Sequence, residues 1–316
     1  MKKVIFVGGT EFSGSTFFHM ILANDANGLA IGEAHNIMRP SRPYHFQMHC
    51  SCGEHPCSLW QELKDAGEQQ LYSELFSRFP DVDFIVDSSK NPFWIQDQKA
   101  VLHRQGIAFQ DIVVWKTPYE FAQSYHKRGS TESWERSWIV YHQLYYTLFD
   151  AWRTVRYHDL TSDHSTLQSV CNFLGLPYFD GKERYWERSS HHVVGGNPSA
   201  RVHLYSGDNA NFQENVQRSS SKIEVLKEGT HRSIYYDAKI DPAVKESVDS
   251  TIRANGQVPA IFDLLDSLDV RREPAALQAD AKFPQQVRMS KHLIQLRKAK
   301  YRSVRSLASF RYGGSR

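Results

Sequence analysis

The chain has 316 residues, of which 41% are hydrophobic and 13% aromatic. This apolar content can bury a sizeable core, and it excludes an intrinsically disordered protein. The formal net charge of +3 does not by itself indicate a nucleic-acid or membrane partner. The charge is unevenly placed, because the segment from Lys282 onward has ten Lys or Arg residues and no Asp or Glu. We therefore treat this basic tail separately from the rest of the chain.

No stretch is long enough to cross a membrane. Met1-Lys2-Lys3 has the charge of a signal peptide, but the apolar run behind it ends at Gly8-Gly9 and is too short for one. The four cysteines agree with a reducing compartment. We expect a cytoplasmic protein.

Residues 4–16 are the part of the chain around which the rest is organised. Val4-Ile5-Phe6-Val7 predicts a buried parallel strand that stops at a glycine pair, and a helix is expected to begin near Ser15. The connecting pattern is that of a phosphate-binding loop in which Ser15 replaces the usual lysine. Backbone N–H groups of such a loop and the helix N-terminus converge on an anion. The pattern consists of Gly9, Thr10, Ser13, Gly14, Ser15 and Thr16.

Residues 28–32 predict a short strand that ends at Glu33. If this second parallel strand lies beside the first, Glu33 comes close to the anion held by the loop, which makes it a candidate general base. A surface carboxylate at a strand end is the alternative. His35 is a weaker candidate, because a single histidine most often only satisfies a hydrogen bond.

Cys50-x-Cys52-Gly53 is followed by Cys57, with His49 and His55 on its flanks. Soft ligands this close can hold zinc. The spacing is not that of a zinc finger, since no second Cys-x-x-Cys or His pair completes it. We therefore expect a folded loop over the acceptor site, and no metal.

The strand expected at residues 84–86 ends in Asp87-Ser88-Ser89-Lys90. Carboxyl ends of parallel strands face the ligand crevice, so this polar tetrad is expected at the same edge of the sheet as the first loop. Lys90 can supply the charge that Ser15 lacks. Alternatively, Asp87 and Ser88 cap the helix that follows.

A further strand is expected at residues 112–115, and Lys116 follows it. Thr117-x-x-Glu120 is a capping box with Pro118 at the first helical position, so a helix is predicted to begin there. Ser124 lies two helical turns further on. Lys116 and Ser124 can grip one phosphate from two directions.

The longest helical pattern covers residues 131–152, and its aromatic stripe, which includes Tyr141, is expected to pack in the core. Helices are also expected near 213–228, 241–254 and 258–268. A tail helix at 287–310 would place Leu293, Leu296, Val304 and Leu307 on one side. Such a helix can lie on an anionic membrane or an acidic glycan. The alternative is a solvated tail, or one docked on the acidic body of the protein.

Taken together, these motifs resemble those of sulfotransferases that use 3′-phosphoadenosine 5′-phosphosulfate (PAPS), especially the bacterial branch close to carbohydrate sulfotransferases. Gly9 to Thr16 resembles the 5′-phosphosulfate loop of that family, and Lys116 with Ser124 occupies its 3′-phosphate site. Asp87-Ser88-Ser89-Lys90 and Cys50-Ser51-Cys52-Gly53 also occur in that branch. Residues 155–160, residues 173–177 and the segment from His191 to Arg201 match further motifs in the expected order.

The resemblance implies a P-loop-like parallel sheet flanked by helices, the sulfotransferase fold, with a helical C-terminal extension. It divides the chain into a sulfotransferase domain at 1–269, with its nucleotide-binding core at about 3–204 and a helical cover at 205–269, and a linker and basic tail at 270–316. PAPS would be the sulfuryl donor, held by the loop residues, Lys116, Ser124 and Arg201. The acceptor would be a hydroxyl group, favoured to be on a carbohydrate. No metal and no nucleic acid is required.

Two departures from the family pattern bear on catalysis. Phe12 stands where the loop usually has Lys or Arg, and Lys116-Thr117-Pro118 replaces Arg-Asp-Pro. The second change keeps the charge but loses the bidentate fork of arginine. The first requires Lys90 or a histidine such as His35 to supply the missing cation. A PAPS-binding protein without turnover and a P-loop kinase remain alternatives, although a kinase needs the lysine that Ser15 replaces.

Overall fold

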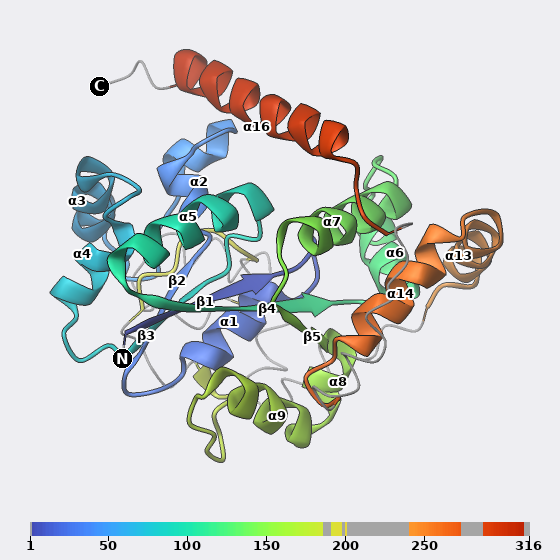
Figure 1. Ribbon diagram of the computed structural model, residues 1–316, viewed down its shortest axis with the longest axis horizontal. Coiled ribbons are helices and arrows are strands. Elements are labelled where there is room, and N and C mark those ends of the chain that lie inside the picture. The colour runs from blue at the N-terminus through green and yellow to red at the C-terminus, as the bar shows by residue number, and fades with distance from the viewer. Residues whose placement is uncertain (1, 186–190, 198–199, 201–239, 273–286, 313–316) are drawn as a thin grey trace.

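The structure is a computed structural model that describes residues 2–185, 191–197, 200, 240–272 and 287–312 (Figure 1). Its centre is a five-stranded sheet in the order β2-β3-β1-β4-β5, and every neighbouring pair of strands is parallel. The sheet confirms the predicted α/β class. The strands are β1 (Lys3–Gly8), β2 (Gly28–Gly32), β3 (Phe84–Asp87), β4 (Ala108–Trp115) and β5 (Arg153–Arg156).

Helices cover both faces of this sheet (Figure 1). Successive side chains of a strand point to opposite faces, so Val4 and Phe6 of β1 belong to one apolar core, whereas Ile5 and Val7 belong to the other. The first core is closed by α3 (Ser58–Ala66), α4 (Leu71–Arg78), α5 (Pro92–Gln105), α6 (Pro118–His126), α7 (Trp134–Leu148) and α14 (Gln257–Ser267). The second is closed by α1 (Ser15–Ala23), α8 (Tyr157–Ser162) and α9 (His164–Leu174).

The strand order corrects one prediction from the sequence. β2 does not lie beside β1, because β3 is inserted between them. β2 and β3 are thus added on one side of β1, whereas β4 and β5 are added on the other side. The order of the strands therefore switches at β1. In open parallel sheets ligands bind outside the carboxyl ends of the strands at such a switch point. The loops that follow β1, β3 and β4 meet there.

Two short elements and the helix α13 are also part of the described fold. The chain after β2 forms α2 (Ala34–Met38) and a 3₁₀ helix (Pro43–Gln47), and α13 (Pro242–Ala254) packs against α6. The helices predicted at 241–254 and 258–268 are present as α13 and α14. The helix predicted at 213–228 lies outside the described residues.

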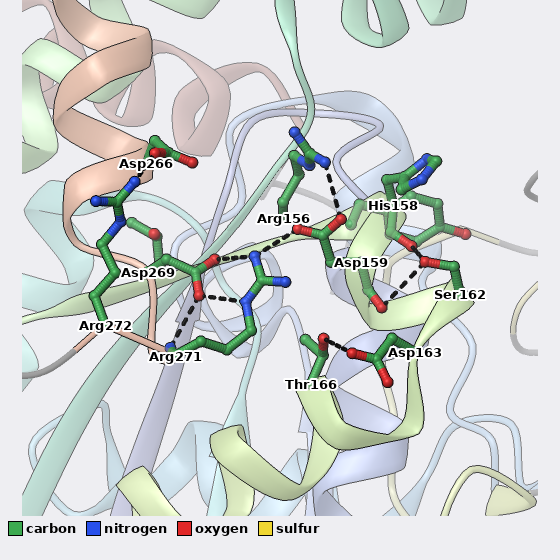
Figure 2. Close-up of polar contacts among 12 residues, drawn as sticks. Arg156, His158, Asp159, Ser162, Asp163, Thr166, Asp266, Asp269, Arg271 and Arg272 are labelled. Carbon is green, nitrogen blue, oxygen red and sulfur yellow. Dashed lines mark hydrogen bonds and ion pairs between the residues drawn. The ribbon is translucent and has the colours of Figure 1, made fainter.

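The chain after α14 is fastened to β5 and α8 (Figure 2). Asp269 forms an isolated parallel bridge with Thr154 of β5. Arg271 contacts both Asp269, at 2.7 Å, and Asp159 of α8, at 2.6 Å, and Asp159 also accepts a hydrogen bond from Arg156 at 2.9 Å. The described residues up to Arg272 therefore belong to the body of the protein.

The basic tail helix α16 (Lys291–Tyr312) lies across the α5 and α7 side of the body (Figure 1). Ile294 and Tyr301 pack on a small core around Phe93 of α5, and Lys298 donates a hydrogen bond to Gln96 at 3.2 Å. The predicted apolar side is not the packed one, since Leu293, Leu296 and Val304 are 49%, 53% and 41% exposed. Helical spacing alone identified apolar residues, but tertiary contacts selected a different face.

Among the described residues, no helix combines the length and the apolar character needed to traverse a bilayer.

Candidate active site

The loop between β1 and α1 has the backbone shape of an anion-binding turn. Gly9 and Gly14 have φ of 148° and 95°, a left-handed region that favours glycine. Both positions are also sterically closed, since a Cβ on Gly9 would lie 2.5 Å from the carbonyl oxygen of Val114 and one on Gly14 would lie 2.2 Å from Tyr157 Cδ2. Phe12 shares the left-handed conformation, with φ of 64°. The loop is thus held tightly against the end of β4 and the start of α8.

The hydroxyl groups of the loop indicate what it holds. Thr10 Oγ1 and Ser13 Oγ are buried and make no hydrogen bond within the part of the chain that the structure describes. A buried hydroxyl without a partner costs on the order of 1–3 kcal/mol, so a ligand that accepts from both would recover this energy. Ser15 and Thr16 begin α1, whose first N–H groups carry partial positive charge. Hydrogen-bond donors and the positive end of the helix therefore meet at this loop, a combination that suits an anion.

Lys116 and Ser124 form a second polar site at the end of β4. Lys116 Nζ donates to Ser124 Oγ at 3.2 Å, and Ser124 Oγ in turn donates to the Glu120 carbonyl oxygen at 2.9 Å. The predicted capping box of Thr117 and Glu120 is present and begins α6, which fixes Ser124 two turns from the cap. Burial lowers the pKa of Lys116 to about 8, because a dry environment disfavours the ammonium form.

Tyr157 contacts both of these sites. Its ring packs on Gly14 at the loop, and Lys116 Nζ lies 4.9 Å from the centroid of the same ring. The loop and the Lys116–Ser124 pair are therefore two separate polar sites, and both lie against the ring of Tyr157. A ligand that fills both needs two separated acidic groups.

Glu33 follows β2 and Lys90 follows β3. The two residues come together because these strands are neighbours in the sheet. Lys90 Nζ contacts Glu33 Oε1, and Asn36 donates to Glu33 Oε2 at 2.7 Å. Burial by itself raises the pKa of Glu33, but the Lys90 ammonium outweighs it and the resulting pKa lies below the ordinary value. Glu33 is therefore a carboxylate at neutral pH. Lys90 has φ of 59°, an unusual left-handed conformation for a non-glycine residue that can mark a functional site.

His35 lies next to this pair without contacting it by a described hydrogen bond. Its ring faces Trp94 at 6.5 Å, and its Nδ1 has no partner among the described residues. Burial lowers the pKa of His35 to about 3, so the imidazole is neutral at physiological pH. His35 therefore does not match the expectation that it supplies a cation beside Phe12.

The polar tetrad Asp87-Ser88-Ser89-Lys90 begins at the last residue of β3 and fixes the position of Lys90. Asp87 is buried and accepts hydrogen bonds from Tyr72 at 2.6 Å and from the indole of Trp94 at 3.2 Å. The alternative interpretation, that Asp87 and Ser88 cap α5, does not hold, because the side chain of Asn91 accepts from the first N–H groups of that helix. Asp87 instead braces the loop that carries Lys90.

Two residues that the sequence did not single out take part in the site. Tyr141 of α7, expected only in the core stripe, accepts a hydrogen bond from the Gly9 N–H at 2.7 Å and donates to the Lys90 carbonyl at 2.9 Å. The guanidinium of Arg128 lies 4.1 Å from the ring centroid of Phe12. The guanidinium of Arg128 therefore lies next to the loop at Phe12. Neither contact has a sequence signal, because each joins distant segments.

The segment at residues 191–197 closes over the loop and Glu33. Asn197 N–H donates to Thr16 Oγ1 at 2.9 Å, and Glu33 N–H donates to the Val194 carbonyl at 2.7 Å. A Cβ on Gly195 would lie 2.9 Å from Glu33 Cβ, and one on Gly196 would lie 2.7 Å from Thr16 Oγ1. Arg201, which was predicted to bind the nucleotide, lies outside the described residues.

The comparisons with known proteins give structural neighbours only. No protein-family model matches the chain, and no curated protein matches it. A sulfotransferase domain from the olefin synthase of Synechococcus PCC 7002 is similar at 17% identity and a TM-score of 0.45, over 79% of this chain and 94% of that one. A sulfotransferase domain from the curacin biosynthetic pathway is similar at 15% identity and a TM-score of 0.46, over 80% and 98%.

Proposed function

We propose that this protein transfers a sulfuryl group from PAPS to a hydroxyl group of an acceptor. The observation that carries the proposal is a pair of separated sites for acidic groups. One is the loop at Gly9–Thr16 and the other is the Lys116–Ser124 pair, and both lie against the ring of Tyr157. PAPS has acidic groups at both its 5′ and 3′ positions. A nucleoside triphosphate would need one continuous site and the lysine that Ser15 replaces.

In this proposal the loop binds the 5′ phosphosulfate. The partnerless hydroxyls of Thr10 and Ser13, with the N–H groups from Gly14 to Thr16, donate hydrogen bonds to its oxygens. Lys116 and Ser124 bind the 3′-phosphate, and Arg201 is proposed to add a second cation there. Charge-assisted hydrogen bonds of this kind are the stronger ones in proteins.

Sulfuryl transfer, like phosphoryl transfer, depends mostly on positioning and on stabilising charge at the leaving oxygen. The acceptor oxygen attacks sulfur, the bond between sulfur and the bridging oxygen breaks, and the acceptor proton passes to Glu33. Glu33 is ionised for this role, but its contact with Lys90 makes it a weak base. We propose that Lys90 turns from Glu33 to the bridging oxygen, which raises the basicity of Glu33 and supplies the cation missing at Phe12.

The acceptor class comes from the resemblance of the loop motifs and not from the geometry of the site. We propose a carbohydrate hydroxyl as the acceptor and the cytoplasm as the compartment. The basic residues of α16 are proposed to give weak contact with an anionic membrane or glycan.

A PAPS-binding protein without turnover is the second candidate. The observation that favours it is the combination of Phe12 in the loop with a Glu33 carboxylate already neutralised by Lys90. Both features remove groups that turnover needs, while leaving the two anion sites intact.

The first experiment measures thermal stabilisation of the purified protein by 3′,5′-adenosine bisphosphate (PAP), by AMP and by ATP with magnesium. A ligand at a hundred times its dissociation constant adds about 2.7 kcal/mol to the free energy of unfolding. We expect PAP alone to stabilise strongly, and Lys116→Ala to abolish the effect. Lys64→Ala, which removes an exposed lysine of α3, is the matched control. Stabilisation by ATP with magnesium alone, or by none of the three, contradicts the proposal.

Turnover is tested separately with radiolabelled PAPS and a panel of glycan, alcohol and phenol acceptors. Transfer that Glu33→Gln abolishes supports the enzyme. PAP binding without transfer to any acceptor class favours the second candidate.

A further inference from the structure

Three of the four cysteines lie close to His192, which is far from them in the sequence. The ligand atoms of Cys50, Cys52, Cys57 and His192 all lie within 4.8 Å of one another. His192 Nδ1 is 3.6 Å from Cys50 Sγ and 3.7 Å from Cys57 Sγ. His49 and His55, which flank the cysteines in sequence, instead stack on each other at 4.2 Å.

The two nitrogen–sulfur distances match those of a tetrahedral metal site. Zinc binds sulfur at about 2.3 Å and imidazole nitrogen at about 2.0 Å, so a nitrogen and a sulfur on one tetrahedral zinc ion lie about 3.6 Å apart. The distances from His192 Nδ1 to Cys50 Sγ and Cys57 Sγ agree with this value. Three thiols and one imidazole also make up a complete structural ligand set.

The backbone positions Cys50, Cys57 and His192 independently of a metal. Cys50 pairs with Val194 in an isolated antiparallel bridge, and Cys57 directly precedes α3. The Ser51 hydroxyl accepts from Val193 N–H at 2.9 Å and donates to the His191 carbonyl at 2.8 Å. The Trp60 indole donates to the carbonyl of His192 at 3.1 Å. The hydrogen bonds on both sides of His192 therefore hold it opposite the cysteines.

The cluster offers four protein ligands and leaves no coordination position for a substrate. Cys50 and Cys57 are only 2% and 6% exposed, and Cys52 and His192 are half-buried. A catalytic zinc site keeps one position for water or substrate, whereas a site with four protein ligands is structural. Soft sulfur ligands in a tetrahedral set select zinc over magnesium or calcium.

We propose that Cys50, Cys52, Cys57 and His192 bind one structural Zn²⁺ ion. Binding converts three thiols to thiolates and releases three protons, and the neutral imidazole leaves the centre with a net charge of −1. The ion ties the cysteine loop to the 191–197 segment, across 135 residues between Cys57 and His192. That segment continues to Gly195, Gly196 and Asn197, which contact Glu33 and Thr16. The metal therefore fixes the segment that covers the proposed active site.

The proposal is tested on the full-length protein, purified without a histidine tag or a chelator and dialysed against metal-free buffer. Elemental analysis is expected to give about one zinc per chain, and X-ray absorption about three sulfur neighbours near 2.3 Å and one nitrogen near 2.0–2.1 Å. Zinc content does not depend on PAPS, so this result stands or fails separately from the proposed function.

Variants then assign the ligands. Cys50→Ser and His192→Ala are expected to reduce the zinc content at least about tenfold. His192→Cys, which offers a fourth thiolate, retains it. Cys171→Ala is the matched control, because Cys171 is the remaining buried cysteine and lies in the other core.

Three results would overturn the proposal. They are folded wild-type protein with almost no zinc, an absorption spectrum with only oxygen and nitrogen neighbours, and a disulfide between two of the three cysteines in protein isolated under reducing conditions. Where a variant does not fold, the absorption spectrum of the wild-type protein decides.

Discussion

Lys90 Nζ contacts the carboxylate of Glu33, which lies 57 residues earlier in the chain. The strands that carry the two residues, β3 and β2, are neighbours in the sheet. Both side chains are mostly buried, with 17% and 13% exposure. This contact joins the candidate base to the candidate cation, and it determines how the corner responds to pH.

Glu33 is expected to make stability depend on pH on the acid side. Its pKa is lowered in the folded protein, so its contribution is complete above the ordinary glutamate value and is lost as the pH falls through the lowered value. Glu33→Gln is expected to reduce the free energy of unfolding by about 1–3 kcal/mol at pH 7 and by much less near pH 3. Denaturant titrations at several pH values measure the difference. Glu246→Gln, at an exposed position of α13, serves as the control, and a difference that grows in acid contradicts the assignment.

Lys116 is expected to make PAP binding depend on pH on the alkaline side. Its pKa in the ligand-free protein is about 8, and only the ammonium form pairs with a phosphate. The dissociation constant should therefore rise up to about tenfold per pH unit above 8. Lys116→Arg, which stays charged, should remove this dependence while retaining binding. Calorimetric titrations between pH 7 and pH 10 test both, and an identical slope in the two proteins would show that another group is responsible.

Gly196 is expected to be intolerant of a side chain for a reason beyond its backbone conformation. Gly196 and Gly129 both have positive φ, of 81° and 60°, but only Gly196 has a neighbour that a Cβ would strike, Thr16 Oγ1 at 2.7 Å. Gly129→Ala should cost about 1–2 kcal/mol of stability from the left-handed backbone alone. Gly196→Ala should cost more and should also weaken PAP binding. Equal effects in thermal unfolding would mean that the 191–197 segment does not press on the loop.

Tyr141→Phe is expected to weaken the positioning of the Gly9–Thr16 loop without leaving a cavity in the core. The change keeps the ring but leaves the Gly9 N–H and the Lys90 carbonyl without their shared hydroxyl partner. Stability should fall by about 1–3 kcal/mol, and PAP affinity should fall with it. Tyr146→Phe, on the same helix but with its ring beside Arg288, is the comparison. If both variants bind PAP as the wild type does, the hydroxyl of Tyr141 does not position the loop.

Local sequence patterns predicted the elements well where the controlling interactions are themselves local. The Gly9–Thr16 loop, the strand before it and the capping box of Thr117 and Glu120 each depend on residues within a few positions of one another. Lys116 and Ser124 are eight residues apart on a strand end and the helix that follows, so their contact could also be predicted.

Tertiary structure decided the features that join distant segments. The sequence could not show that β3 separates β2 from β1, nor that Tyr141 bridges Gly9 and Lys90. The sequence places three members of the cysteine cluster close together, and its spacing led us to expect no metal there; the fourth member, His192, lies 135 residues beyond Cys57, and no spacing rule reaches that far. Backbone propensity and periodicity act over a few turns, whereas the site and the proposed zinc centre depend on sheet order and packing, which bring residues together only once the whole chain has folded.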